Sequence, residues 1–149
     1  MLVCIIILAW ACGGGVRSVP DDATTSSASS ASNTEADDAK GIGKFTQVDL
    51  PATIDKSMVA AGQKVYDLKC AACHHLDGTK LVGPGWKDVT LRRKPEWIMN
   101  FVTNTDANLN KDPQAMTLLE ECMVRMPNQN LSDDDARRIL EFMRNNDAK

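Results

Sequence analysis

The sequence predicts a single all-α domain preceded by a leader that does not belong to its core. The chain has 149 residues, about the length of one domain, and 43% of them are hydrophobic, enough for one packed core. Aromatic residues make up only 5%, whereas apolar residues recur at helical spacing behind capping residues in the last two-thirds of the chain. Seventeen Lys and Arg against 20 Asp and Glu give a formal charge of −3, which excludes the basic surface that binds nucleic acid.

The first 40 residues are predicted to be an export signal and a flexible tether. Residues 1–11 (MLVCIIILAWA) form an apolar run about half as long as the ~20 residues that cross a bilayer, and are typical of a secretory signal. The junction at Cys12 resembles a bacterial lipoprotein signal, which implies cleavage before Cys12 and acylation of its thiol. Ordinary cleavage, an uncleaved anchor and a buried segment are the alternatives. The rest of residues 12–40 is mostly small and polar, too poor in apolar side chains to offset the entropy of ordering.

Residues 41–149 are expected to form the folded domain, with four helices that each have a recognisable start. Proline favours the first helical turn, and Ser or Asp side chains cap the first free N–H groups. The four helices are expected to begin near Asp55 or Ser57, at Pro95, at Pro113 behind the capping Asp112, and after Ser132, which precedes three aspartates. Between the first two helices, residues 78–93 contain three glycines and a proline and form a long loop of the kind that usually carries function.

Residues 70–74 read CAACH, the C-x-x-C-H pattern that attaches c-type haem. Two thiols three positions apart at a helix end lie on one side of the chain, where each can add to a vinyl group of the porphyrin. The imidazole of His74 can then reach the iron. A thioredoxin-like dithiol would need a βαβ context, which is missing from this sequence. A zinc site would need about four ligands, with only His75 and Cys122 as further candidates.

Residues 55–146 resemble a class I mono-haem cytochrome c. The resemblance rests on Gly62 and Tyr66 ahead of the CAACH pattern, on Gly83-Pro84, on Met126-Pro127 and on the capped last helix. It implies the cytochrome c fold, with about four helices around one haem c. It also implies thioether bonds from Cys70 and Cys73, with His74 as an axial iron ligand. Gly62 would let the first and last helices cross closely, and an incidental helix glycine is the alternative.

The second axial ligand is expected to be a methionine thioether, which together with histidine raises the reduction potential of haem. Most methionines of this chain sit in helical patterns, where Met usually fills cores. Met123 and Met126 remain. Pro127 favours an extended backbone at Met126, so that its sulfur can point inward. Because Met126 also occupies the family's Met position, the sequence predicts Met126, with Met123 as the alternative.

Three further residues are predicted to lie in the haem pocket. The resemblance implies that the carbonyl of Pro84 accepts the other ring N–H of His74 and fixes the imidazole; a simple turn proline is the alternative. Trp86 and Trp97 are expected to line the haem, with the indole N–H of Trp97 reaching a propionate, or else to be ordinary core aromatics.

Three other features receive the simpler interpretation. His75 cannot point the same way as His74 on a regular backbone, so we expect it to be exposed or to support its neighbour. Cys122 is expected to be a small buried apolar residue. The basic run 92–94 (RRK) is expected to be solvated, although it could steer an acidic redox partner.

These patterns predict an electron-transfer protein and not an enzyme, since no nucleophile with its base or pair of catalytic carboxylates is recognisable. We expect a monomeric electron carrier of a respiratory chain. It would be lipid-anchored on the periplasmic side of a bacterial cell envelope and pass electrons from a quinol-oxidising complex or dehydrogenase to a terminal oxidase or reductase. The alternatives are a ligand-binding haem sensor, a small haem peroxidase, or a fixed electron-entry module of a larger reductase.

Overall fold

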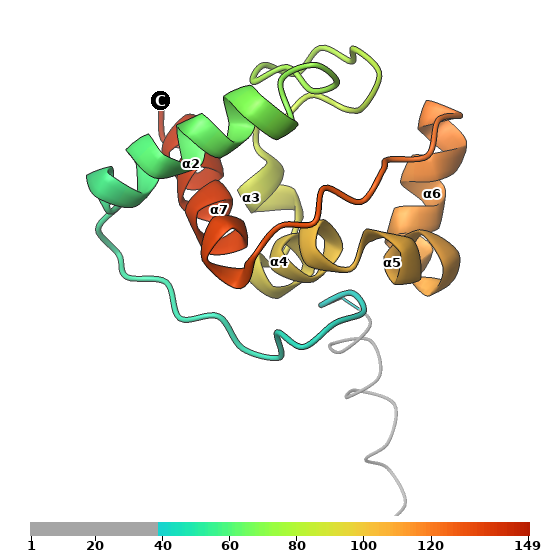
Figure 1. The fold of residues 1–149 in the computed structure, drawn as a ribbon, viewed down its shortest axis with the longest axis horizontal. Coiled ribbons are helices and arrows are strands. Elements are labelled where there is room, and N and C mark those ends of the chain that lie inside the picture. Colours follow the sequence, from blue (N-terminus) through green and yellow to red (C-terminus); the bar gives the residue numbers. More distant parts are fainter. Residues whose placement is uncertain (1–38) are drawn as a thin grey trace, which may run out of the picture.

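The structure is a computed structural model that describes residues 39–149. The predicted signal 1–11, Cys12 and the tether up to residue 38 lie outside the described residues. Residues 39–149 form six helices and no strand (Figure 1). The helices are α2 (Lys56–Lys69), α3 (Val89–Arg92), α4 (Pro95–Thr103), α5 (Thr105–Lys111), α6 (Pro113–Cys122) and α7 (Asp133–Asp147). The all-α prediction is therefore confirmed.

Four of the helices correspond to the predicted ones, and their capping residues act as expected. The side chain of Asp55 accepts from the N–H groups of Ser57 and Met58 at the start of α2. Asp112 caps α6, and Ser132 caps α7. The prediction of four helices is too low, because α3 forms inside the predicted loop 78–93 and α5 follows α4 almost directly. These two helices span only 4 and 7 residues, too few to show a helical apolar period.

Helices α2 and α7 cross in close contact, and Gly62 lies at the crossing (Figure 1). A Cβ atom at Gly62 would collide with the backbone carbonyl of Arg138 and would lie 2.8 Å from the Cβ of Phe142. The ring of Phe142 in turn lies 5.4 Å from the ring of Tyr66. The close crossing implied by the family resemblance is therefore confirmed, and it explains a glycine in the middle of a helix.

Residues 39–55 form an extended strap that runs along the helices before α2 begins (Figure 1). Two buried amides bind its backbone. Asn100 accepts from the N–H of Phe45 at 2.9 Å and donates to its carbonyl, while Asn108 does the same with Ile42 at 2.7 and 2.8 Å. Buried amides need such partners, so the strap is an integral part of the domain.

No helix among residues 39–149 combines the length and the apolar character that crossing a bilayer would require.

Candidate functional site

The CAACH turn follows directly on the last turn of α2 and faces a set of apolar cavities. The N–H groups of Cys73 and His74 both donate to the carbonyl of Cys70 at 3.0 Å, which folds residues 70–74 into a tight turn. Cys70, Cys73 and His74 line the same cavity, of about 40 Å³. Burial raises the pKa of the Cys70 thiol to about 11, so this thiol is neutral until it is modified.

His74 is held in one orientation and one protonation state. Its Nδ1 lies 2.9 Å from the carbonyl oxygen of Pro84, which can only accept, so Nδ1 carries the hydrogen and Nε2 keeps a free lone pair. Burial lowers the pKa of His74, and the hydrogen bond to Pro84 opposes this only in part. The hydroxyl of Tyr66 donates to the carbonyl of His74 at 2.6 Å. Gly83 leaves room for the ring, because a Cβ there would lie 2.8 Å from Nδ1. The predicted contact of Pro84 is thus present.

The loop that contains Pro84 is fastened to the end of α7. The carboxylate of Asp147 accepts from the N–H of Asp88 and of Thr90 at 2.8 Å, and from the Thr90 hydroxyl at 2.7 Å. One residue earlier, the amide of Asn146 donates to the carbonyl of Leu76 at 2.8 Å. The last helix therefore fixes both sides of the loop that positions His74.

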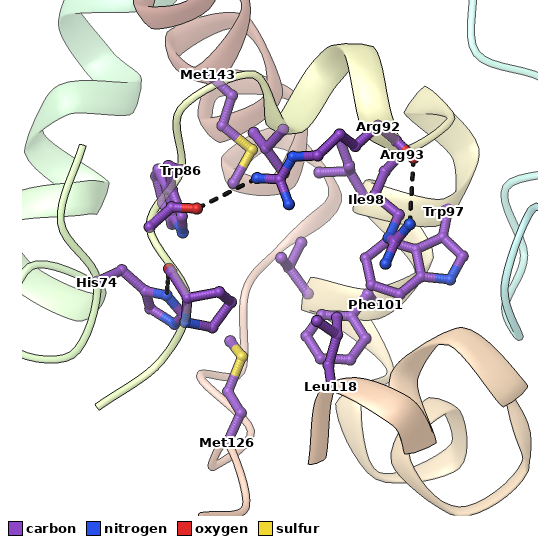
Figure 2. Close-up of a pocket in the computed structure, with 14 residues that line it drawn as sticks. His74, Trp86, Arg92, Arg93, Trp97, Ile98, Phe101, Leu118, Met126 and Met143 are labelled. Carbon is purple, nitrogen blue, oxygen red and sulfur yellow. Dashed lines mark hydrogen bonds between the residues drawn. The ribbon is translucent and has the colours of Figure 1, made fainter. Parts of the chain in front are cut away.

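Met126 faces the same cavities as His74 from the segment between α6 and α7. Three cavities, of about 80, 120 and 40 Å³, are each lined by both residues. Figure 2 shows the sulfur of Met126 directed into the first of these cavities, with the imidazole of His74 at another side. Met123 lines none of the three and is 85% exposed, since it ends α6 with a φ of 56°. Of the two methionines considered from the sequence, the structure places only Met126 at the site.

Trp86 and Trp97 both line the first cavity, but they have different surroundings. Trp86 packs edge-on against Tyr66 at 5.0 Å and lies 5.6 Å from the ring of His74. The indole N–H of Trp97 donates to Asp112 at 2.8 Å. The predicted contact of this N–H with a propionate is therefore wrong in this structure, because Asp112, the capping residue of α6, takes the hydrogen bond.

Arg92 and Arg93 also line the first cavity, a position that the sequence does not predict (Figure 2). Arg92 and Lys94 are exposed, as expected for a solvated run, whereas Arg93 is half-buried and departs from that prediction. The guanidinium of Arg93 lies over the ring of Trp97, 5.1 Å from its centroid, and burial lowers its pKa. Arg92 donates to the carbonyl of Lys87 at 2.9 Å. Arg92 ends α3 and Arg93 follows it in an extended conformation, and the four residues of α3 carry no periodic signal that would predict this turn.

The remaining two candidates lie at the edge of the site. His75 is exposed, with its Nδ1 2.8 Å from the hydroxyl oxygen of Thr79, as expected. Cys122 is only partly buried and lines the second cavity together with Cys73. The prediction of a fully buried packing residue is therefore wrong for Cys122, because the last turn of α6 points it toward the cavity.

The residues at this site fit a covalently bound haem. Two free thiols, a neutral imidazole with its Nε2 available and a thioether converge on cavities whose lining is mostly apolar. A porphyrin ring requires apolar walls, its two vinyl groups require thiols, and its iron accepts nitrogen and sulfur ligands. The guanidinium groups of Arg92 and Arg93 add cations suited to the two propionates of the ring.

Comparison with known proteins points to the same chemistry. The family model described as "Cytochrome c" matches residues 59–147. Among solved structures, cytochrome c from Rhodothermus marinus is 36% identical with a TM-score of 0.71, and the match covers 76% of this chain and 97% of that one. An engineered cytochrome c from the same organism is 35% identical, with a TM-score of 0.71 and coverages of 77% and 98%. A structure of the engineered protein bound to a carbene intermediate is also 35% identical, with a TM-score of 0.68. A search of curated proteins gave no match.

Proposed function

Because the chain belongs to the cytochrome c family, with one covalently attached haem c, we propose that it is a single-electron carrier with His74 and Met126 as the axial iron ligands. The observation that carries this proposal is that both residues line all three cavities, from segments about 50 residues apart in the sequence. Cys70 lines the third of these cavities and Cys73 the second and third, and these two residues are the attachment residues.

When bound, the haem supplies an iron that gains or loses one electron. The residues around the haem are arranged so that the protein structure changes little when the iron changes its charge. His74 is held by Pro84 with its proton on Nδ1, so the ligating nitrogen need not gain or lose a proton. Met126 offers a neutral sulfur, and the apolar lining keeps water from the site. With both His74 and Met126 bound to the iron, no position would remain for a substrate, which favours electron transfer over catalysis.

We further propose that this electron carrier works in a respiratory chain. The donor would be a quinol-oxidising complex or a dehydrogenase, and the acceptor a terminal oxidase or reductase. Electron carriers form small interfaces and short-lived complexes with their partners, so the protein would act as a monomer with weak affinity for each partner. A lipid at Cys12 and the tether 12–40 would keep the domain near membrane-bound partners at high local concentration. Replacing Cys12 with Ser should release the protein from membranes, and membrane attachment that persists would refute acylation.

The electron-carrier proposal is tested by the ligands of the iron. The protein, produced in a host competent for cytochrome maturation, should carry the mass of one haem. In the ferric state it should show the weak near-infrared band of Met-ligated haem. When reduced, its low-spin spectrum should not change under carbon monoxide. A colourless product, or rapid formation of a carbon monoxide adduct, would contradict the proposal.

A second candidate is a ligand-binding haem sensor or a small peroxidase. It is favoured by the weak backbone connection of the segment around Met126. Within the described residues 39–149, residues 124–131 make no backbone–backbone hydrogen bond. The engineered relative from Rhodothermus marinus, which is described as bound to a carbene intermediate, is an example of this fold holding a small reactive ligand. Ready binding of carbon monoxide by the unmodified protein would favour this second function.

A further inference from the structure

Residues 123–131, here called the distal loop, carry Met126 and have little backbone support of their own (Figure 1). The N–H of Met123 closes α6 on the carbonyl of Leu119 at 2.8 Å. After it, no backbone–backbone hydrogen bond joins the loop to any other part of the described chain. Met123 and Asn130 have φ values of 56° and 50°, so the chain turns sharply on either side of Met126. What fixes the loop must therefore be side chains.

Two cations connect the distal loop to two different helices. The Nη2 of Arg125 lies 3.2 Å from Oδ1 of Asp106 and 3.0 Å from Oδ1 of Asn110. These two acceptors are four residues apart on α5, so Arg125 spans one face of that helix. From the other side, Nζ of Lys69 in α2 donates to the carbonyl of Gln129 at 2.9 Å. Arg125 also lies 3.4 Å from the carbonyl oxygen of Asp106, and within residues 39–149 these are the side-chain hydrogen bonds that join the loop to other elements.

We propose that Arg125 is a positioning residue that keeps Met126 on the haem iron by fastening the distal loop to α5. This inference rests on the proposed function, since it presupposes ligation by Met126. Arg125 directly precedes Met126 in the chain. When the contact of Arg125 with α5 is lost, the backbone at Met126 is therefore free to move. Loss of the ion pair with Asp106 raises the fraction of molecules in which Met126 has left the iron. A neutral ligand that competes for this position then binds more tightly in proportion.

The test is a titration of the ferric haem protein with imidazole. Arg125→Gln should bind imidazole about two- to fivefold more tightly than the unmodified protein, which is the range that an exposed ion pair gives. Asp106→Asn should have a similar effect, and the double variant should add little to either single change. Added salt screens the ion pair, so it should tighten imidazole binding by the unmodified protein and leave Arg125→Gln nearly unchanged. A purely structural role would not produce this difference in salt dependence.

Arg138→Gln is the matched control. The side chain of Arg138 is 42% exposed, as is that of Arg125, and it also forms an ion pair, with Asp135 at 3.0 Å, but on α7. Equal imidazole affinity in Arg125→Gln and the unmodified protein would overturn the proposal, as would an equal gain in Arg138→Gln. The near-infrared band of the unmodified ferric protein separates this failure from that of the proposed function. If the band is absent, ligation by Met126 is itself wrong.

Discussion

His74 is fixed by contacts from three separate segments, whereas Met126 depends on a loop that two surface cations hold in place. On the histidine side, Tyr66 binds the backbone, Pro84 binds the imidazole, and Asp147 fixes the loop that carries Pro84. Each of these groups belongs to a different part of the domain. The comparison shows that two sides of one site can differ in how firmly they are held, because rigidity is supplied locally and not by the fold as a whole. We therefore expect Met126 to be the more readily displaced of the two predicted ligands.

The largest expected effect comes from separating α2 and α7, the helices that support the histidine side. Gly62→Val places side-chain atoms where the carbonyl of Arg138 and the Cβ of Phe142 already lie, so α2 and α7 must separate. We expect a loss of about 3 kcal/mol or more in the free energy of unfolding, since overpacking meets backbone here and not a flexible side chain. Denaturant unfolding measures it. Ala60→Val, at an exposed position of α2, is the control and should cost only a few tenths of a kcal/mol, at most about 0.7.

The second prediction breaks the methionine side instead. Met126→Ala should abolish the near-infrared band, lower the reduction potential and allow carbon monoxide to bind, while the fold and the haem remain. Spectroscopy and a redox titration measure these changes. Met123→Ala is the matched control because its side chain is 85% exposed and lines none of the three cavities. Loss of the band in Met123→Ala but not in Met126→Ala would assign the ligand to Met123.

The histidine side of the site was easier to predict from the sequence than the methionine side. The CAACH motif is contiguous in the sequence, so its spacing alone predicts the histidine ligand and both attachment thiols. Helices α2, α4, α6 and α7 were predictable because their caps and apolar periods are local. Met126 required an argument from Pro127 and from a family resemblance. The position of Arg92 and Arg93 at the first cavity could not be predicted, since it depends on the path of the chain at and just after α3, whose four residues have no period of their own.

The hydrogen bonds of Trp97 and Arg125 show the same limit. The partner of Trp97 is Asp112, 15 residues later, and the partner of Arg125 is Asp106, 19 residues earlier. Both partners are brought into place by α5 and its junction with α6. Without α5, the sequence does not indicate that either side chain meets its acceptor, and a propionate contact stays one of two alternatives for the indole N–H of Trp97.

A smaller effect is expected when a single contact is removed from the histidine side. Tyr66→Phe keeps the ring between Trp86 and Phe142 but deletes the 2.6 Å hydrogen bond to the carbonyl of His74. We expect the free energy of unfolding to fall by about 1–2 kcal/mol. The near-infrared band should persist, since it reports ligation by Met126 and Pro84 still orients the imidazole. Loss of that band in Tyr66→Phe would show that ligation by Met126 also depends on this contact of the histidine side.

The smallest effect is a dependence of stability on pH, and it arises at Glu141, which is 1% exposed on α7. Burial alone would raise the pKa of Glu141. Hydrogen bonds from Arg137, the N–H of Asp55 and Arg144 outweigh burial and hold this pKa below its ordinary value of 4.5. A carboxylate with a lowered pKa stabilises the folded state above its ordinary pKa and loses that contribution as the pH falls through the folded value.

Acidification should therefore weaken the scaffold and leave the methionine side unchanged at first. Over the first pH unit below 4.5, Glu141 should account for a loss of at most about 1 kcal/mol in the free energy of unfolding. Glu141→Gln should be less stable at neutral pH and lose correspondingly less on acidification, whereas Glu120→Gln, at an exposed site on α6, should follow the unmodified protein. The near-infrared band should stay constant in this range, because the Glu141 network contacts the strap and α2 but not the distal loop. A band that fades together with stability would mean that the two sides of the pocket are coupled more tightly than their contacts indicate.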